Sequence, residues 1–456
     1  MTERWLFELP ECLVEPGQEP APVTPVAGIP RRRVACRDQV VMRMRSLDQM
    51  LPPDEEARTV VAFVEPADLS QLYDSLRAVD GGPGRSPTDP QILRSLWLSA
   101  TIKGVGSARA LERPCRFHLA YQWICGDVSV NDHTRSDFRV DHAEVLDRLL
   151  TQQIAQFMFV GAVTLERVAQ DGVRVRASAG TSSFRRKPTL EKCLVAAEAQ
   201  VTSLPEEVRN DPGAATRREP AARVRAARER EPRVRDALKA CAEVPAAKEQ
   251  RGGGSLKQPA RGSTTDPDAR KRKRPDGGTR PAFNVPFATD TASQVLVGVD
   301  AINAGTDHGQ LGPMSPQIAS RTGQRPEAHL ADGGFASEED LEELNDPGDG
   351  PKRSLPVRDA PKKRTQGLDP FAPLPGDSPA RAEGRQRLGT DAAQAIDQQR
   401  ASTAEGVNAL ARQRGRTQFR VRGLPQVKII ATWFALAHNV LRWAFLQTLP
   451  RLASSR

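Results

Sequence analysis

The sequence predicts an α/β protein in which a helical N-terminal domain precedes a sheet-containing core that polar insertions interrupt. The first observation is that apolar residues recur at helical spacing through residues 89–160. The second is a series of β-rich runs alternating with helical patterns. In chain order these are strands at 163–177 and 283–300, a helix at 309–321, a strand at 327–335 and a helix at 391–412. The third is that two segments rich in charge, proline and glycine, 181–282 and 345–390, separate the runs.

Composition indicates a polyanionic partner. The 456 residues include 66 Lys and Arg against 57 Asp and Glu, a net charge of +9, and such an excess is typical of nucleic-acid binding. Solvated basic loops are the alternative explanation. The six cysteines form no CxxC pair, so we expect reduced thiols, no zinc site and a cytoplasmic, nucleoid-associated protein. The beginning of the chain has no export-signal pattern.

The first 160 residues divide into an arm and a helical domain. Residues 1–60 are rich in Pro, Arg and acids, which predicts a loosely ordered arm, and 61–160 form a helical domain. Within it, Asp89-Pro90 is a helix start and Ser107 can cap a second helix after a Gly turn. The pair is compatible with a helix-turn-helix, although most such pairs are packing units. Asp141 and Glu144 suggest a capping box for a third helix.

The core is predicted to begin with a hairpin. Two β-rich runs flank Asp171-Gly172, a strong turn signal. The insertion 181–282 is expected to be partly solvated helix and partly disordered linker, ending in the basic run Arg270–Arg274. The apolar stretch from Val427 to Leu446 contains Lys428, His438, Asn439 and Arg442, which favours a helix buried on the sheet over a membrane span.

Three acids can support phosphodiester chemistry if folding unites them. Two divalent ions roughly 3.5–4 Å apart stabilise attacking and leaving oxygens when carboxylates converge from different elements. Asp171 and Asp332 each end a predicted strand, and Glu405 lies on a later helix. Each acid also has an ordinary structural reading: a hairpin turn residue, a turn before Gly-Gly, and a solvated helix acid.

The chain resembles bacterial insertion-sequence transposases that carry an InsH-type N-terminal domain and a DDE catalytic domain on an RNase H-like fold. The N-terminal blocks are GRSPTDPQILRSLWL and SVNDHTRSDFRVDH; the catalytic blocks are VAQDGVRVRASAG, FNVPFATDTASQVLVGVDAINAGTDHGQ, HLADGGFAS and AEGVNALARQRGRTQFRVRGL with ALAHNVLR. The resemblance implies an RNase H-like mixed sheet flanked by helices. It assigns 61–160 to DNA binding and 161–447 to catalysis, with 448–456 as a tail.

The resemblance also implies roles for single residues. The catalytic and metal-binding carboxylates would be Asp171, Asp332 and Glu405, with two Mg²⁺ or Mn²⁺ ions as cofactor. The DNA contacts would be Asn408, Arg412, Arg414, Arg420 and Arg422, and we add the basic run Arg270, Lys271, Arg272, Lys273 and Arg274 as phosphate contacts. Solvated surface arginines are the alternative for Arg420 and Arg422. Such an enzyme would bind terminal inverted repeats, cleave the element ends and join them to target double-stranded DNA, as at least a dimer on DNA and with no membrane partner.

Two other functions stay open. The segment 345–365 is very polar where an RNase H-like core places an apolar strand, and only Leu355–Val357 remains as a candidate. A catalytically decayed or domesticated transposase that still binds DNA would explain this. An RNase H-like nuclease acting on RNA is the third hypothesis, because a fold does not fix a function.

Overall fold

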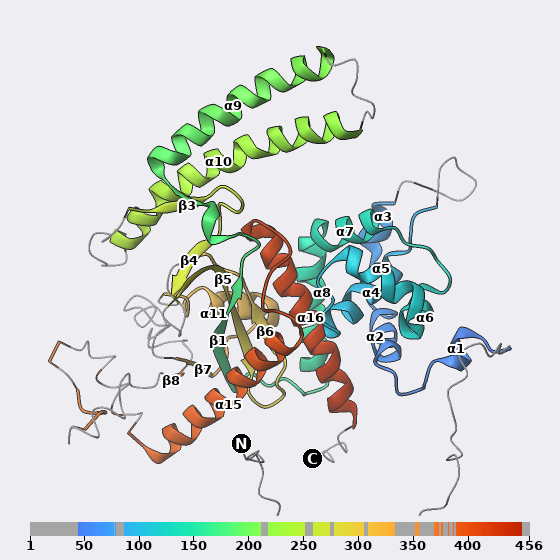
Figure 1. Cartoon of the computed structure of the whole chain (residues 1–456). Coiled ribbons are helices and arrows are strands. Elements are labelled where there is room, and N and C mark those ends of the chain that lie inside the picture. The colour runs from blue at the N-terminus through green and yellow to red at the C-terminus, as the bar shows by residue number, and fades with distance from the viewer. Residues whose placement is uncertain are drawn as a thin grey trace, which may run out of the picture. The chain divides into compact units, whose positions relative to one another are not determined.

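The computed structural model divides the chain into two compact units, Met1–Arg45 and Ser46–Arg456, and every element below belongs to the second. It describes residues 44–76, 78, 86–210, 218–250, 259–273, 278–304, 309–332, 352–354, 369–373, 375–376, 382, 386 and 389–448. This unit combines α-helices with one mixed sheet (Figure 1), as the sequence predicts.

The N-terminal half of the unit is helical. Its helices are α1 (Leu47–Met50), α2 (Glu56–Val64), α3 (Ser70–Asp74), α4 (Pro90–Ile102), α5 (Ala108–Phe117), α6 (Leu119–Cys125), α7 (Asp132–Asp141) and α8 (Ala143–Phe159). Helical structure therefore begins at Leu47, inside the segment 1–60 for which the sequence predicts an arm. Buried Ala57, Val60 and Val64 explain the difference, because they give α2 an apolar face that packs into the core. The part of the predicted arm before residue 44 lies outside the described residues.

Helix starts are set by local capping. The Asp89 carboxylate accepts a hydrogen bond from the Gln91 N–H at 2.7 Å, and the Ser107 hydroxyl accepts one from the Ala110 N–H at 3.1 Å. Both predicted starts are confirmed. The predicted capping box before α8 is wrong, because His142 occupies the N-cap position and makes no side-chain cap.

The six-stranded sheet has the order β4-β5-β1-β7-β8, and β6 also pairs with β5. The strands are β1 (Arg167–Arg176), β4 (Arg270–Lys273), β5 (Thr279–Asp290), β6 (Leu296–Val299), β7 (Ala328–Ala331) and β8 (Lys352–Ser354). The strands β4, β5, β1 and β6 pair antiparallel, whereas β7 runs parallel to both β1 and β8. The sheet is therefore mixed, with β1 at its centre.

Asp171-Gly172 is not a hairpin turn. β1 runs straight through both residues, and its antiparallel partner is β5, where Gly172 lies opposite Pro286. A Cβ on Gly172 would lie 2.6 Å from Nδ2 of Asn284, whose side chain is fully buried. The glycine therefore serves the close approach of a residue far along the chain, and the local turn signal gives way to tertiary packing.

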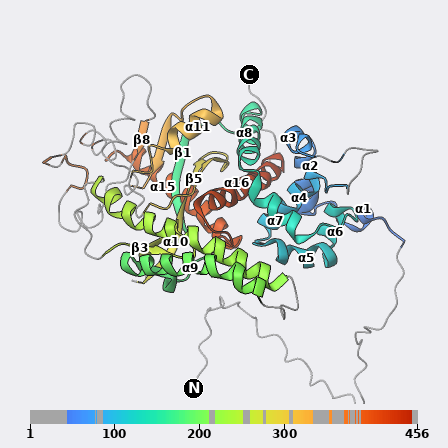
Figure 2. The ribbon, with the colours of Figure 1, turned by 90° about the horizontal axis from the view of Figure 1, so that it is seen from above.

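The insertion between β1 and β4 is a helical hairpin. A short strand β2 (Phe184–Arg186) leads into α9 (Lys187–Asn210), α10 (Arg218–Gln250) follows, and β3 (Arg261–Ser263) pairs with β2. The two helices lie side by side away from the sheet (Figure 2). Leu190, Val234, Ala237 and Cys241 form a small core between them, so they pack more closely than the composition predicts. The GGGS sequence of the predicted linker lies outside the described residues.

The polar segment after β7 contributes a strand despite its composition. β8 pairs with β7 in parallel register, Ala328 opposite Lys352 and Leu330 opposite Ser354. It stands just before the stretch Leu355–Val357, which lies outside the described residues. The expected strand is thus formed by polar residues at the sheet edge, where charged side chains are tolerated. The predicted helix over SEEDLEEL also lies outside the described residues.

The last helix, α16 (Leu424–Thr448), joins the two halves of the unit. By length and hydropathy it is the one described helix that could cross a membrane, but 61% of its apolar window is buried inside the protein. Asn439 bonds both backbone groups of Leu296 in β6, and the Trp433 indole donates to the Arg139 carbonyl at 3.1 Å. α16 therefore occupies a core position, as the sequence predicts.

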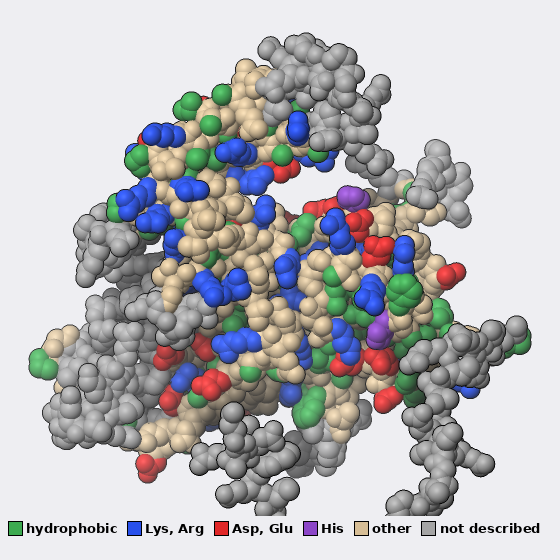
Figure 3. All heavy atoms as spheres, in the orientation of Figure 1, with side chains coloured by type: hydrophobic (Ala, Val, Ile, Leu, Met, Phe, Trp, Pro, Cys, Tyr) green, Lys and Arg blue, Asp and Glu red, His purple; other side chains and the backbone are tan. Residues whose placement is uncertain are grey.

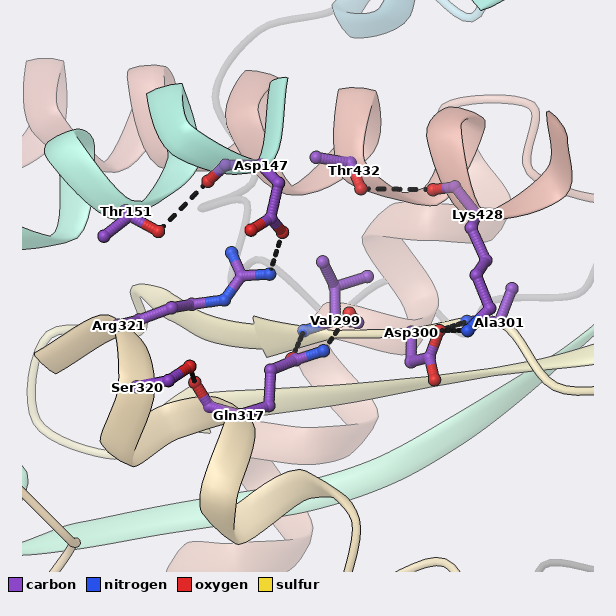
Figure 4. Close-up of polar contacts among 10 residues, drawn as sticks. All are labelled: Asp147, Thr151, Val299, Asp300, Ala301, Gln317, Ser320, Arg321, Lys428 and Thr432. Carbon is purple, nitrogen blue, oxygen red and sulfur yellow. Dashed lines mark hydrogen bonds and ion pairs between the residues drawn. The ribbon is translucent and has the colours of Figure 1, made fainter. Parts of the chain in front are cut away.

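Further polar contacts tie the helical domain and the last helix to the sheet layer (Figure 4). Arg321 of α11 (Met314–Thr322) bonds Asp147 of α8, and Lys428 of α16 bonds Asp300 at 2.8 Å. The helical domain is thus anchored to the sheet by side chains from several elements.

Candidate functional site

One predicted acid lies in β1, and a second directly follows β7, the parallel strand beside it. The last paired residues of β1 and β7 are Gln170 and Ala331. Asp171 is the next residue of β1, and Asp332 is the next residue after β7. The parallel register therefore brings the two acids to neighbouring positions. Asp332 is exposed directly after β7, as predicted, whereas Asp171 lies inside β1 and does not end it.

Hydrogen bonds fix the Asp171 carboxylate. One oxygen accepts the Gly172 N–H at 2.7 Å, and the other accepts Nδ2 of Asn408 at 2.7 Å. Asn408 belongs to α15 (Asp391–Gln413), which crosses β1 on this side. The neighbouring Gln170 points to the other face, where its Nε2 donates to the Gln310 carbonyl. Alternation along β1 therefore presents Asp171 to α15.

Side chains at successive turns hold α15 over the sheet. Gln399 accepts from Arg167 of β1 at 3.1 Å, and Thr403 accepts from Gln294 at 3.1 Å. Glu405 follows within one turn and is exposed, three residues before the buried Asn408. Because residues three apart share a helix face, Glu405 and Asn408 lie on the same side of α15.

The donor chemistry of these residues suits a hard cation. Asp171, Asp332 and Glu405 offer carboxylate oxygens, the ligands that Mg²⁺ prefers. The Asn408 Oδ1 atom is also buried, with no hydrogen-bond partner in the part of the chain that the structure describes. Among the described residues, however, no three His, Cys, Asp or Glu side chains lie in an arrangement that could hold a metal ion. The structure brings the three acids to one region of the fold without drawing their side chains into a ligand set.

The predicted arginines in the last turn of α15 and after it differ in accessibility. Arg412, Arg420 and Arg422 are exposed. Arg414 is half-buried, and burial lowers its pKa. Asn408, which the resemblance assigns to DNA, is 5% exposed and donates a hydrogen bond to Asp171.

Two further arginines in this region were not singled out from the sequence. Arg416 follows α15 and Arg139 lies in the last turn of α7, and they are 8% and 7% exposed. Burial lowers the pKa of Arg416 to about 10; burial, and then the charge of Arg416, lower the pKa of Arg139 to about 9. Arg139 donates to the Gly106 carbonyl at 2.6 Å and lies over the Trp97 ring. No pattern in the sequence distinguishes these two arginines from solvated ones.

Close backbone contact joins the helical domain to the end of α15 at this point. A Cβ on Gly104 would lie 3.2 Å from the Arg414 carbonyl, and one on Gly415 would lie 3.1 Å from the Gly104 carbonyl. Both glycines have positive φ angles, +72° and +74°, which other residues rarely adopt. The α4–α5 turn and the α15 end thus form one seam, which we call the arginine seam and define by Arg139, Arg414, Arg416 and Arg420.

The basic run is not a free segment at the end of an insertion. Residues Arg270–Lys273 form β4, an edge strand of the main sheet, so the core resumes before residue 282. Arg272 is 4% exposed and donates to the Ala304 carbonyl, and Lys271 lies 5.3 Å from the Phe184 ring centre. Arg270 donates to the Pro267 carbonyl at 2.7 Å. The Lys273 side chain and Arg274 lie outside the described residues. Arg270 and Arg272, which are predicted phosphate contacts, thus each donate to a backbone carbonyl of the protein, and Arg272 is buried.

Positive side chains gather on one face of the molecule. In the view of Figure 3, Lys and Arg are spread over the α9–α10 hairpin and over the middle of the face. A face of this kind suits a polyanion.

One family model matches part of the helical half. Residues 45–141 match the family model described as Transposase domain (DUF772). The match covers α1 to α7 and ends before the sheet. No curated protein and no solved structure matches the chain.

Proposed function

We propose that this chain, which carries a transposase domain at residues 45–141, is a transposase of the DDE type that cuts and rejoins DNA at the ends of an insertion sequence. One observation carries the proposal. Asp171 lies in β1 and Asp332 directly follows β7, the parallel strand that pairs with β1, and α15, the helix that bears Glu405, contacts both strands. A mixed sheet flanked by helices, with the acids at its centre, is the architecture that an RNase H-like catalytic domain requires.

The metal ions of such an enzyme would be held by Asp171, Asp332 and Glu405. Their oxygen donors fit Mg²⁺ or Mn²⁺, which when bound would stabilise charge on the attacking and leaving oxygens of the DNA. The chain's own contribution is to orient the ligands. Asn408 and the Gly172 N–H fix the Asp171 carboxylate, in the way that outer residues orient metal ligands in proteins generally.

DNA would be held by two kinds of contact. Exposed Arg412, Arg420 and Arg422 lie close in sequence to Glu405 and suit phosphate binding. Recognition of the terminal repeats is assigned to the helical domain, where α5 is the more exposed helix of the α4–α5 pair and α4 is almost wholly buried. A packed helix with an exposed face can enter a major groove. Two copies on one DNA complex would bring both element ends together.

Cleavage of an oligonucleotide with purified protein tests the proposal. The substrate is the end sequence that flanks the coding region, supplied with Mg²⁺ or Mn²⁺ and a target duplex. We expect nicking and strand transfer, and at least about a 100-fold slower reaction for Asp171→Asn, since metal stabilisation of the transition state is worth several kcal/mol. Asp397→Asn is the matched control, because Asp397 lies on α15, the helix that bears Glu405, and pairs with Arg400. Equal loss in both variants, or none in either, would contradict the assignment.

A second candidate is a transposase-derived protein that binds DNA without cutting it. The observation that favours it is that the described acids do not form a ready metal-ligand group. Binding of element ends at nanomolar protein with no metal-dependent nicking would establish this alternative. The formation of β8 by the polar segment counts against a decayed core. Competition between an end duplex and an RNA–DNA hybrid separates both candidates from an RNase H-like nuclease.

A further inference from the structure

A cavity in the helical domain is lined by two thiols. It has a volume of about 630 Å³ and is bounded by α5, α6 and the start of α7. Cys115, in the last turn of α5, and Cys125, the last residue of α6, both line it. Both are free cysteines; Cys115 is partly exposed, and Cys125 is 5% exposed. A small molecule in the cavity can therefore reach the Cys115 thiol.

The path of the chain brings the two thiols together. A single residue, His118, separates α5 from α6, and its extended backbone turns the chain so that the two helices pack against each other. A side-chain hydrogen bond joins the thiols, and Cys125 is its donor. The pair therefore lies within one helical corner of the domain, and no distant element has to move for the two sulfur atoms to meet.

A buried cation acts on one of the two thiols. Arg135 of α7 is 2% exposed and lines the same cavity, and it acts on Cys115 through its charge and a hydrogen bond. The hydrogen bond from Cys125, assisted by Arg135, lowers the pKa of Cys115 from 9.0 to about 7, although burial opposes this. The same hydrogen bond, followed by burial, raises the pKa of Cys125. At neutral pH about half of the Cys115 side chains are therefore thiolates, while Cys125 keeps its proton.

The other charged side chains of the cavity do not replace Arg135 in this role. Glu112 and Arg116 both line the cavity and pair with each other at 3.1 Å. Asp127 and Asp132, which also line it, are anions and cannot stabilise a thiolate. A partly exposed thiolate beside a cation, with a second thiol next to it, is the environment in which cysteines react with oxidants.

We propose that Cys115 and Cys125 form a modification site that reacts with small hydroperoxides, with Cys115 as the attacking thiolate and Cys125 as the resolving thiol. Disulfides of this kind in reducing compartments are usually transient, so the site is reduced until a peroxide reaches it. The proposal does not depend on the proposed DNA cleavage, because none of the three acids takes part in it.

The modification consists of two balanced steps. The Cys115 thiolate attacks one oxygen of hydrogen peroxide, the O–O bond breaks and hydroxide leaves, so the sulfur is oxidised to a sulfenic acid and the peroxide is reduced. The Cys125 sulfur then attacks the Cys115 sulfur. An S–S bond forms, the S–O bond breaks, and the hydroxyl group leaves as water with the Cys125 proton. The proton that Cys115 had lost neutralises the hydroxide, so two thiols and one peroxide give one disulfide and two water molecules.

Peroxide treatment of the full chain, followed by mass spectrometry of its peptides, tests the proposal. Every sample carries Cys12→Ser and Cys36→Ser, so that only the four described cysteines can react. We expect a disulfide between Cys115 and Cys125 that dithiothreitol reduces. In Cys125→Ser, dimedone should instead trap a sulfenic acid on Cys115, because the resolving thiol is missing.

Two replacements of Cys125 separate its role as a hydrogen-bond donor from its role as a nucleophile. The rate of iodoacetamide alkylation of Cys115 is measured against pH, since this rate follows the thiolate fraction. Its midpoint should lie near pH 7 when Cys125 is present and should stay there in Cys125→Ser, whose hydroxyl still donates. In Cys125→Ala the midpoint should rise toward 9.0. Alkylation at pH 7 should then slow about 5-fold, because the smaller thiolate fraction outweighs the greater nucleophilicity of each thiolate.

The α9–α10 hairpin provides an internal control in the same samples. Cys193 and Cys241 pack in the small apolar core between its helices, and burial raises the pKa of Cys241. Peroxide should therefore modify Cys241 at least about 10-fold more slowly than Cys115.

Three results would overturn the proposal. The first is that peroxide leaves Cys115 and Cys125 unlinked. The second is that a sulfenic acid forms on Cys193 or Cys241 as fast as on Cys115. The third is an alkylation midpoint for Cys115 at or above about pH 8.5, the value of an ordinary thiol. DNA cleavage measured on the reduced samples reports separately on the proposed function.

Discussion

Gly172 lies against the buried Asn284 side chain, so one added methyl group tests how β1 is built. A Cβ at this position would stand 2.6 Å and 2.7 Å from the two terminal atoms of the Asn284 amide. Asn284 is fully buried in β5 and its backbone bonds Ile302 in both directions, so it has no route to solvent. We therefore expect Gly172→Ala to strain the centre of the sheet.

The size of the effect follows from two opposing contributions. Overpacking a well-filled core costs about 1–3 kcal/mol. Replacing glycine by alanine within a strand returns roughly 0.5–1 kcal/mol, since Gly172 has an ordinary strand φ that alanine adopts freely. The net expectation is a loss between about 0 and 2.5 kcal/mol in the free energy of unfolding, with a midpoint of about 1 kcal/mol.

Urea unfolding of the full chain, followed by circular dichroism, measures the loss. The variants are Gly172→Ala, Asn284→Ala and the double substitution, arranged as a double-mutant cycle. The methyl group fits the space that Asn284 vacates, so the double variant should be more stable than the sum of the single effects by at least about 1 kcal/mol. A zero coupling energy would refute the packing argument and would favour a local turn at Asp171-Gly172.

Three other predictions follow from single contacts. Asn408→Ala should slow DNA cleavage about 10-fold, with unchanged DNA affinity, because it frees the Asp171 carboxylate; a pure affinity loss in a gel-shift titration would contradict this. Burial raises the pKa of Asp266 from 3.8 to about 6, so the folded state binds the extra proton. Stability from this group is then complete below pH 3.8 and falls by roughly 3 kcal/mol as pH rises through 6, and Asp266→Asn should flatten this part of the urea-midpoint profile; an unchanged profile would count against it. Replacing Arg420 and Arg422 by Ala should reduce the slope of log affinity against log salt by about 1.8, and an unaltered slope would exclude both as phosphate contacts.

The elements that depend on local chemistry could be predicted from the sequence. The starts of α4 and α5 follow from Asp89 and Ser107, whose side chains cap the next turn. β5 and β7 follow from apolar runs, and α16 from its length and hydropathy. These features need no information from distant residues.

The structural features that the sequence predicted wrongly depend on residues far apart in the chain. Asp171-Gly172 has the composition of a turn, but Asn284 and β5 make it the middle of a strand. Arg270–Lys273 has the composition of a solvated run, but an edge strand accepts charged side chains while its backbone pairs with β5. Local charge carries no signal of such pairing.

The candidate site was predictable in part. The resemblance selects Asp171 and Asp332, and the sheet register brings them to adjacent positions. The contact from Asn408 to Asp171, and the burial of Arg139 and Arg416, arise where α15 meets β1 and the helical domain. Such packing is visible only once the chain is folded.

The most direct test of the central claim is a count of metal ions bound to the chain on DNA. Free Mn²⁺ is followed by electron paramagnetic resonance while it is titrated into the protein bound to an uncleavable end duplex. If Asp171, Asp332 and Glu405 form one site, the native chain and Asp397→Asn bind about two ions per chain, whereas Asp332→Asn and Glu405→Gln each lose them. Unchanged Mn²⁺ binding in either acid variant would contradict the claim that these carboxylates share a metal site.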